Sequence, residues 1–112
     1  IKYIPYLFND DMMFDKWATY AYSLQCILKK NNIRYLMSNT CEGLSVTEYN
    51  TNIINKLDTL HYPHITSDKD SMVVWLLDQG IKKTPCWHFR EYGHQVWADR
   101  LETYLKELGY VE

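Results

Sequence analysis

The sequence predicts an α/β fold, a helix-rich unit with few parallel strands and a central strand near residues 33–38. One observation behind this prediction is an apolar stripe at helical spacing in the first third of the chain. Another is the short apolar and aromatic run 33–38, which follows that stripe after paired asparagines. A helix, a tight turn and a short apolar run together are typical of an α-to-β unit with a buried strand.

The first helix is expected to begin just after Asn9, where an asparagine and two aspartates supply capping side chains and negative charge. Lys29 to Asn32 close it with cations and with asparagines that tolerate a left-handed conformation. Residues 1–8, which contain Pro5, are expected to form an edge strand or an extended lead-in. The apolar stripe of the helix consists of Phe14, Trp17, Ala18, Ala21, Leu24 and Leu28.

Two further helices are expected in the middle of the chain. Residues 47–57 carry apolar side chains at helical spacing, although several asparagines weaken the pattern. Ser67 and Asp70 resemble a capping box ahead of a second apolar stripe. Gly80 follows that stripe as a natural C-terminal cap.

The last helix is expected to begin at residues 90–91 and to end at Gly109. Four helices then accompany one good strand, which by itself cannot satisfy its own buried backbone groups. Its partners must be residues 1–8, residues 61–65, another copy of the chain, or a segment missing before Ile1. The prediction is therefore a single α/β domain over 1–112 that is a fragment or shortened relative of a larger domain.

Composition excludes several classes of protein. Hydrophobic residues make up 46% and charged residues 23%, which is ordinary for a folded globular chain. A net charge of −2 gives no electrostatic case for nucleic acid, and no apolar run reaches membrane-spanning length. Cys26, Cys41 and Cys86 are odd in number and widely spaced, which favours reduced thiols in an intracellular setting over a disulfide framework.

Four histidines raise the question of a metal site. His61 and His64 stand three residues apart, a spacing that suits zinc on one helical turn. Pro63 lies between them and makes a regular turn unfavourable, and no third ligand stands at motif spacing. No metal and no cofactor is therefore expected.

Polar residues follow the predicted strand at its C-terminal end. In open α/β sheets the ligand crevice lies beyond the C-terminal ends of the strands. Ser38, Asn39, Thr40 and Glu42 are therefore candidate site-lining residues by position alone. A plain loop is the alternative interpretation of the same stretch.

A motif at 88–101 places a histidine ahead of a Tyr-Gly-His turn and an amphipathic helix. His88 is followed by Gly93 and His94, and a Trp-Ala pair at residues 97–98 lies near the start of the helix. This arrangement resembles the end of SGNH (GDSL-type) hydrolases, a family that finishes with a catalytic histidine, a Gly-His pair and such a helix. The resemblance extends upstream in chain order and is best in the second half.

The resemblance implies a three-layer, SGNH/flavodoxin-like fold and the hydrolysis of a small ester or acyl substrate by a serine nucleophile. In that scheme His88 is the general base. Cys86 and His94 are candidate site-lining residues by their position near His88, and a cap or packing role is the alternative for His94. The sequence departs from the family where Pro85 and Cys86 replace the orienting aspartate. The serine block of such enzymes is absent too, so the chain is expected to be a C-terminal portion that is inactive alone.

The alternative hypothesis is a non-catalytic α/β association module. The chain contains ten tyrosines, four tryptophans and three phenylalanines, and that much aromatic surface suits burial against a partner. In this interpretation the unpaired strand or the aromatic faces hold a homo-oligomer together, without nucleic acid or a membrane as partner.

Overall fold

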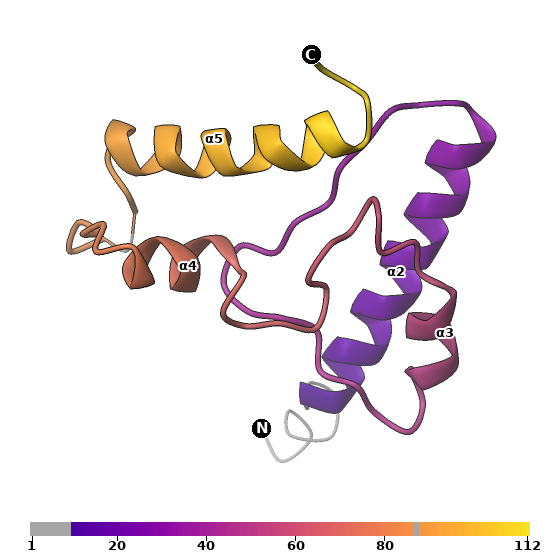
Figure 1. Ribbon diagram of the computed structural model, residues 1–112. Coiled ribbons are helices and arrows are strands. Elements are labelled where there is room, and N and C mark those ends of the chain that lie inside the picture. The colour runs from indigo at the N-terminus through magenta and orange to yellow at the C-terminus, as the bar shows by residue number, and fades with distance from the viewer. Residues whose placement is uncertain (1–9, 87) are drawn as a thin grey trace.

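The computed structural model describes residues 10–86 and 88–112. Within these ranges the regular elements are helices, and the β interaction consists of one isolated antiparallel bridge between Lys83 and Phe89. The edge strand or extended lead-in predicted for residues 1–8 lies outside the described residues. The helices in chain order are α2 (Asp10–Lys30), α3 (Thr51–Lys56), α4 (Met72–Asp78) and α5 (Glu91–Glu107) (Figure 1).

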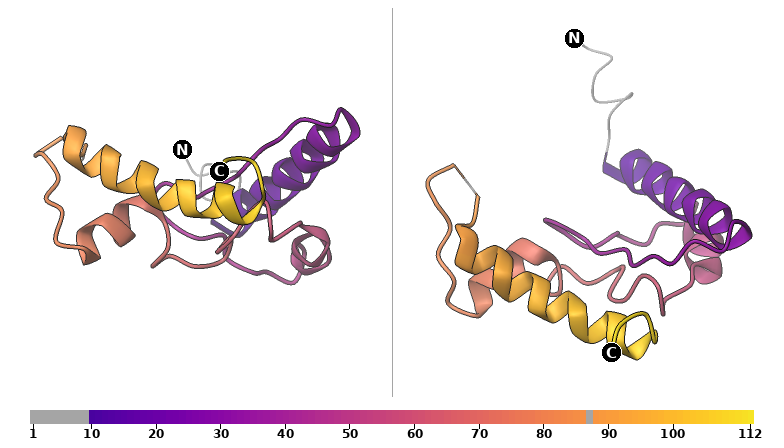
Figure 2. Two further views of the ribbon diagram at one scale, coloured as in Figure 1. Left: turned by 45° about the horizontal axis from the view of Figure 1, so that its top comes forward. Right: turned by 90° about the horizontal axis from the view of Figure 1, so that it is seen from above.

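The predicted α/β fold, with parallel strands and a central strand at 33–38, is wrong. The described residues are 50% helical and form no sheet. Residues 33–39, hereafter the open segment, cross the molecule between α2 and α5 without regular pairing (Figures 1 and 2). The Met37 N–H donates to the His61 carbonyl at 2.8 Å, and the next backbone N–H along this loop that donates to a backbone carbonyl is that of Leu44. Isolated bonds of this kind do not make a ladder.

The reason lies in the loop opposite the open segment. Pro63 lacks an N–H, and His64 has a left-handed backbone with φ 59°. The extended conformation therefore ends after Tyr62, and this loop cannot pair residue by residue with the open segment as a second strand. A side chain takes the place of the ladder, because the buried Asn39 carboxamide donates to the Ile65 carbonyl at 2.9 Å.

The four predicted helices are confirmed as α2, α3, α4 and α5. Ala18 and Ala21 from the predicted stripe of α2 are buried, and Asn32 beyond its end is left-handed with φ 54°. Gly80 and Gly109 follow α4 and α5 with φ of 80° and 75°, as expected for glycines that end helices. Helical spacing and terminal residues therefore predicted these elements correctly.

The predicted capping box at the start of α4 is wrong. The Ser67 hydroxyl donates to the Asp70 carboxylate at 2.7 Å instead of bonding a helical N–H group. The first two N–H groups of α4 donate to the carbonyls of Asn39 and Thr40, each at 2.9 Å. The last residue of the open segment and the residue after it therefore cap α4, and this fixes the end of the segment against the helix.

Two separate hydrophobic clusters stabilise the molecule. The molecule is flat, with extents of 46 × 40 × 19 Å, and its radius of gyration of 16.0 Å exceeds the roughly 13 Å of a compact chain of this length (Figure 2). No helix in the described ranges has the length and apolar character needed to cross a membrane. The first cluster, around α2 and α3, consists of Ala18, Ala21, Leu44, Leu57, Tyr62 and Ile65. The second, between α4 and α5, consists of Leu76, Phe89 and Trp97.

Candidate functional site

His88 lies in the short loop that leads into α5. The Thr84 N–H donates to the His88 carbonyl at 2.7 Å, and the bridge between Lys83 and Phe89 closes the loop. The His88 side chain is exposed, and no described side chain bonds its imidazole. The loop therefore presents this histidine to solvent without the orienting partner that a general base needs.

The residues that follow His88 in the motif have clear packing roles. Phe89 and Trp97 are buried in the second cluster. A Cβ at Gly93 would lie 2.7 Å from the Phe89 Cβ, so the position requires a residue without a side chain. Close packing of the loop on α5 accounts for the spacing of these residues in this structure.

The other predicted site residues lie in two different places. Cys86 and His94 are exposed in the same part of the chain as His88. Ser38, Asn39 and Thr40 instead line an open cleft of about 450 Å³ together with Trp17, Cys41, Glu42 and Tyr62. Cys86, His88 and His94 are not among the residues that line this cleft.

Asn39 has a structural position within this cleft. Its carboxamide oxygen accepts a hydrogen bond from the Tyr62 hydroxyl, which in turn accepts one from the Trp17 indole at 3.2 Å. Its amide group donates to Ile65, and the side chain is 6% exposed. Because every polar atom of this side chain has a partner, Asn39 holds the open segment against the first cluster.

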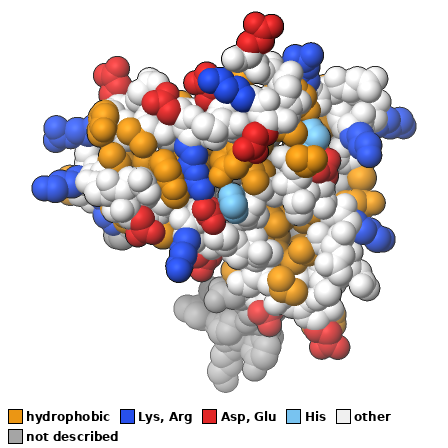
Figure 3. Space-filling model, viewed as in Figure 1, with side chains coloured by type: hydrophobic (Ala, Val, Ile, Leu, Met, Phe, Trp, Pro, Cys, Tyr) orange, Lys and Arg blue, Asp and Glu red, His pale blue; other side chains and the backbone are white. Residues whose placement is uncertain are grey.

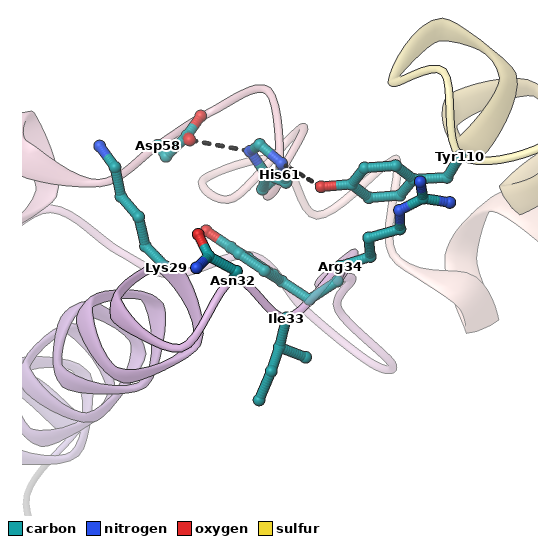
Figure 4. A pocket seen from close by; sticks show the side chains of 8 residues that line it. Lys29, Asn32, Ile33, Arg34, Asp58, His61 and Tyr110 are labelled. Atoms are coloured by element: carbon teal, nitrogen blue, oxygen red, sulfur yellow. Dashed lines mark hydrogen bonds and ion pairs between the residues drawn. The ribbon is translucent and has the colours of Figure 1, made fainter.

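Sequence reasoning missed a second site, which is built around His61. His61 Nδ1 lies 2.8 Å from the Asp58 carboxylate, and Nε2 lies 2.7 Å from the Tyr110 hydroxyl (Figure 4). An ionised carboxylate only accepts hydrogen bonds, so in neutral His61 the proton is on Nδ1 and Nε2 accepts from Tyr110. The ring of Tyr35 stacks on the imidazole, with 4.6 Å between centroids.

Local and distant parts of the chain position Asp58, His61 and Tyr110, hereafter the triad. The Asp58 carboxylate accepts the Leu60 N–H at 3.0 Å, a turn in which a side chain bonds the backbone two residues on. The buried Gln25 carboxamide clamps the backbone of Asp58, accepting its N–H at 2.8 Å and donating to its carbonyl at 3.1 Å. Left-handed Gly109 turns the chain after α5, and the Tyr110 N–H donates to the Leu105 carbonyl at 2.9 Å.

The electrostatics of this site favour an ionised carboxylate beside the imidazole. Partial burial raises the pKa of Asp58. The hydrogen bond and charge of His61 and the hydrogen bond from the Leu60 N–H lower the pKa by more than burial raises it, so the pKa lies below its ordinary value. Burial, followed by the negative charge of Asp58, raises the pKa of Tyr35. The pocket beside the triad has a volume of about 260 Å³ and is also lined by Lys29, Asn32, Ile33 and Arg34.

A third polar cluster joins the two halves of the molecule. The Arg100 guanidinium donates to the Asp70 carboxylate at 2.7 Å and lies 4.4 Å from the ring centroid of Trp75. The hydrogen bond from Ser67 and the charges of Arg100 and His64 lower the pKa of Asp70. These groups satisfy one another's hydrogen-bonding and charge requirements, so the cluster links α5 to the loop before α4.

No group of three or more histidine, cysteine, aspartate or glutamate side chains in the described ranges is arranged to hold a metal ion. No family model matches the chain, and no curated protein or solved structure is significantly similar to it. The geometry of the chain itself is therefore the basis for the functional proposals.

Proposed function

We propose that this chain is an association module that pairs with a second copy of itself along the open segment. The observation that carries the proposal is the state of the backbone there. In the described part of the chain, the carbonyls of residues 33–38 accept no hydrogen bond, and the N–H groups of Arg34, Tyr35 and Leu36 donate none. Unpaired backbone groups in open chain are a template for pairing with another chain.

A groove beside the open segment offers room for a partner. The groove has a volume of about 410 Å³ and lies between the open segment and α5. Its apolar wall includes Leu36, Leu101 and Leu105. A second extended segment placed here would bond the free backbone groups and remove these side chains from water, and both effects favour association.

The shape and surface of the molecule favour a second copy as the partner. A segment that pairs with its own copy about a two-fold axis needs only one self-complementary surface. The broad face of 46 Å by 40 Å has room for the roughly 800 Å² that each partner buries in a standard interface. Apolar side chains also break the polar surface of the face shown in Figure 3. On the outer side of α2, helical spacing aligns the exposed side chains Met13, Tyr20, Leu24 and Ile27.

Ser38→Pro is expected to weaken self-association about tenfold or more, because proline removes an N–H group and obstructs pairing. Ser38 is exposed, and its N–H has no partner in the described residues, so the monomer should keep its fold. Analytical ultracentrifugation over a concentration series measures the effect, and circular dichroism checks the fold. Ser38→Ala is the matched control and should associate like the wild type. A wild type that stays monomeric throughout, or a proline variant that associates normally, contradicts the proposal.

A second candidate function is the one implied by the resemblance to SGNH hydrolases. We infer that His88 acts as the general base of an ester hydrolase whose serine is supplied by another polypeptide segment. The observation that favours it is the exposed imidazole in the loop ahead of α5, which no described side chain bonds and which a group outside the described chain can reach.

In a longer protein that contains the serine segment as well as this chain, His88→Ala is expected to lower the turnover of p-nitrophenyl acetate about 100-fold. Exposed histidines react slowly with activated esters by themselves, so the control must also remove an exposed imidazole. His94→Ala provides this control, because His94 is exposed on the neighbouring helix. Equal rates for the two variants in that longer protein would refute a catalytic role for His88.

A further inference from the structure

The pocket beside His61 has an excess of positive charge. Lys29 and Arg34 line it, and neither forms an ion pair with a described residue. The one carboxylate in the lining, Asp58, has both oxygens engaged, one by the Leu60 N–H and the other by His61. The two cations are therefore left to attract a negatively charged group from solution.

The hydrogen bond between His61 and Tyr110 can reverse its direction. With neutral His61, the Tyr110 hydroxyl donates to Nε2 across 2.7 Å. When Nε2 gains a proton it becomes a donor, and the Tyr110 oxygen must accept. The Tyr110 O–H keeps its proton and is then available to donate a hydrogen bond to another acceptor. Protonation of His61 therefore adds a positive charge and frees a hydrogen-bond donor at the wall of the pocket.

We propose that this pocket binds the phosphate or carboxylate group of a small ligand and binds it more tightly when His61 is protonated. This function is separate from the self-association proposed above. Lys29 from α2 and Arg34 from the open segment supply charge on two sides of the triad (Figure 4). Tyr110 supplies the released donor, and the guanidinium of Arg34 lies 5.4 Å from its ring centroid.

The charged and titratable groups around His61 belong to its own loop, to α2, to the open segment and to the chain after α5. Asp58 belongs to the same loop, its pKa lies below the ordinary value, and its carboxylate lies 2.8 Å from His61 Nδ1. Lys29 and Arg34 place two cations in the lining of the same pocket. An oxyanion between them is attracted by both cations and by protonated His61, so ligand binding and protonation of His61 support each other. The phenol rings of Tyr35 and Tyr110 complete the surroundings.

Sodium sulfate is a suitable probe, because its charge stays constant while an imidazole titrates. We expect sulfate to bind about tenfold more tightly near pH ~5.5 than near pH ~8, on either side of the ordinary imidazole range. Chemical-shift titration by NMR at constant ionic strength measures the affinity, and the shifts should centre on Tyr35, His61 and Tyr110. A parallel titration with succinate tests carboxylates, and the anion that binds more tightly identifies the ligand class.

Two neighbouring lysines provide a matched pair of variants. Lys29→Ala is expected to weaken sulfate binding several-fold, whereas Lys30→Ala should leave it unchanged, because Lys30 is exposed and outside the pocket lining. His61→Gln should remove the pH dependence. Equal losses for the two lysine variants, a pH-independent affinity of the wild type, or a pH dependence that persists in His61→Gln would overturn the proposal. Repeating the titration in Ser38→Pro separates anion binding from association, because Arg34 and Tyr110 also line the groove.

Discussion

Gly43→Ala is expected to destabilise the fold by about 3 kcal/mol or more. A Cβ at this position would lie 2.6 Å from the Ser67 nitrogen and 2.6 Å from the carbonyl carbon of Thr66. Both are backbone atoms and cannot rotate aside as a flexible side chain does. The Gly43 N–H also donates to the Asp68 carboxylate at 2.6 Å, so a shift of this segment would break a hydrogen bond. Urea unfolding measures the change in the free energy of unfolding.

Gly80→Ala is the control for this prediction. Nothing lies within 4 Å of a Cβ at Gly80, so the same chemical change meets no obstacle there. Its backbone is left-handed with φ 80°, and alanine should therefore cost about 1–2 kcal/mol. If Gly43→Ala is no more destabilising than Gly80→Ala, the close approach of the two backbone segments is refuted.

Leu76→Ala is expected to destabilise the protein by about 2–5 kcal/mol. Leu76 is 0% exposed and lies in the second cluster, whose other buried members are Phe89 and Trp97. Alanine removes buried methyl groups and leaves a cavity that the surrounding side chains refill only in part. Urea unfolding measures the loss, and amide hydrogen exchange should increase first in α4 and α5, because the first cluster shares no buried residue with the second.

The neighbouring leucine tests whether this effect depends on burial. Leu77 is 40% exposed, so Leu77→Ala should cost less than about 1 kcal/mol. Similar losses at the two positions would show that the second cluster does not pack as described. A uniform rise in exchange throughout the protein would show that the two clusters unfold together.

The sequence predicted only part of the candidate site around His61. Asp58 and His61 are three residues apart, and the turn that joins them is a local signal that the sequence contains. Gln25 lies 33 residues from Asp58, and Tyr110 lies 49 residues from His61. The folded chain brings these partners together, and no local sequence pattern predicts such a contact. The prediction of a catalytic base concentrated on His88, whose exposed imidazole has no partner in the described residues.

The sequence by itself determined the four helices and the glycines that end α4 and α5. Helical hydrogen bonds join residues four apart, so the spacing of apolar residues and the terminal residues contain the necessary information. Tertiary structure decided that residues 33–38 are not a strand. A strand needs a partner of matching conformation, and Pro63 with left-handed His64 interrupts the extended conformation of the facing loop. An apolar run indicates which segment can be buried, whereas the pairing of that segment with another strand depends on residues far away in the sequence.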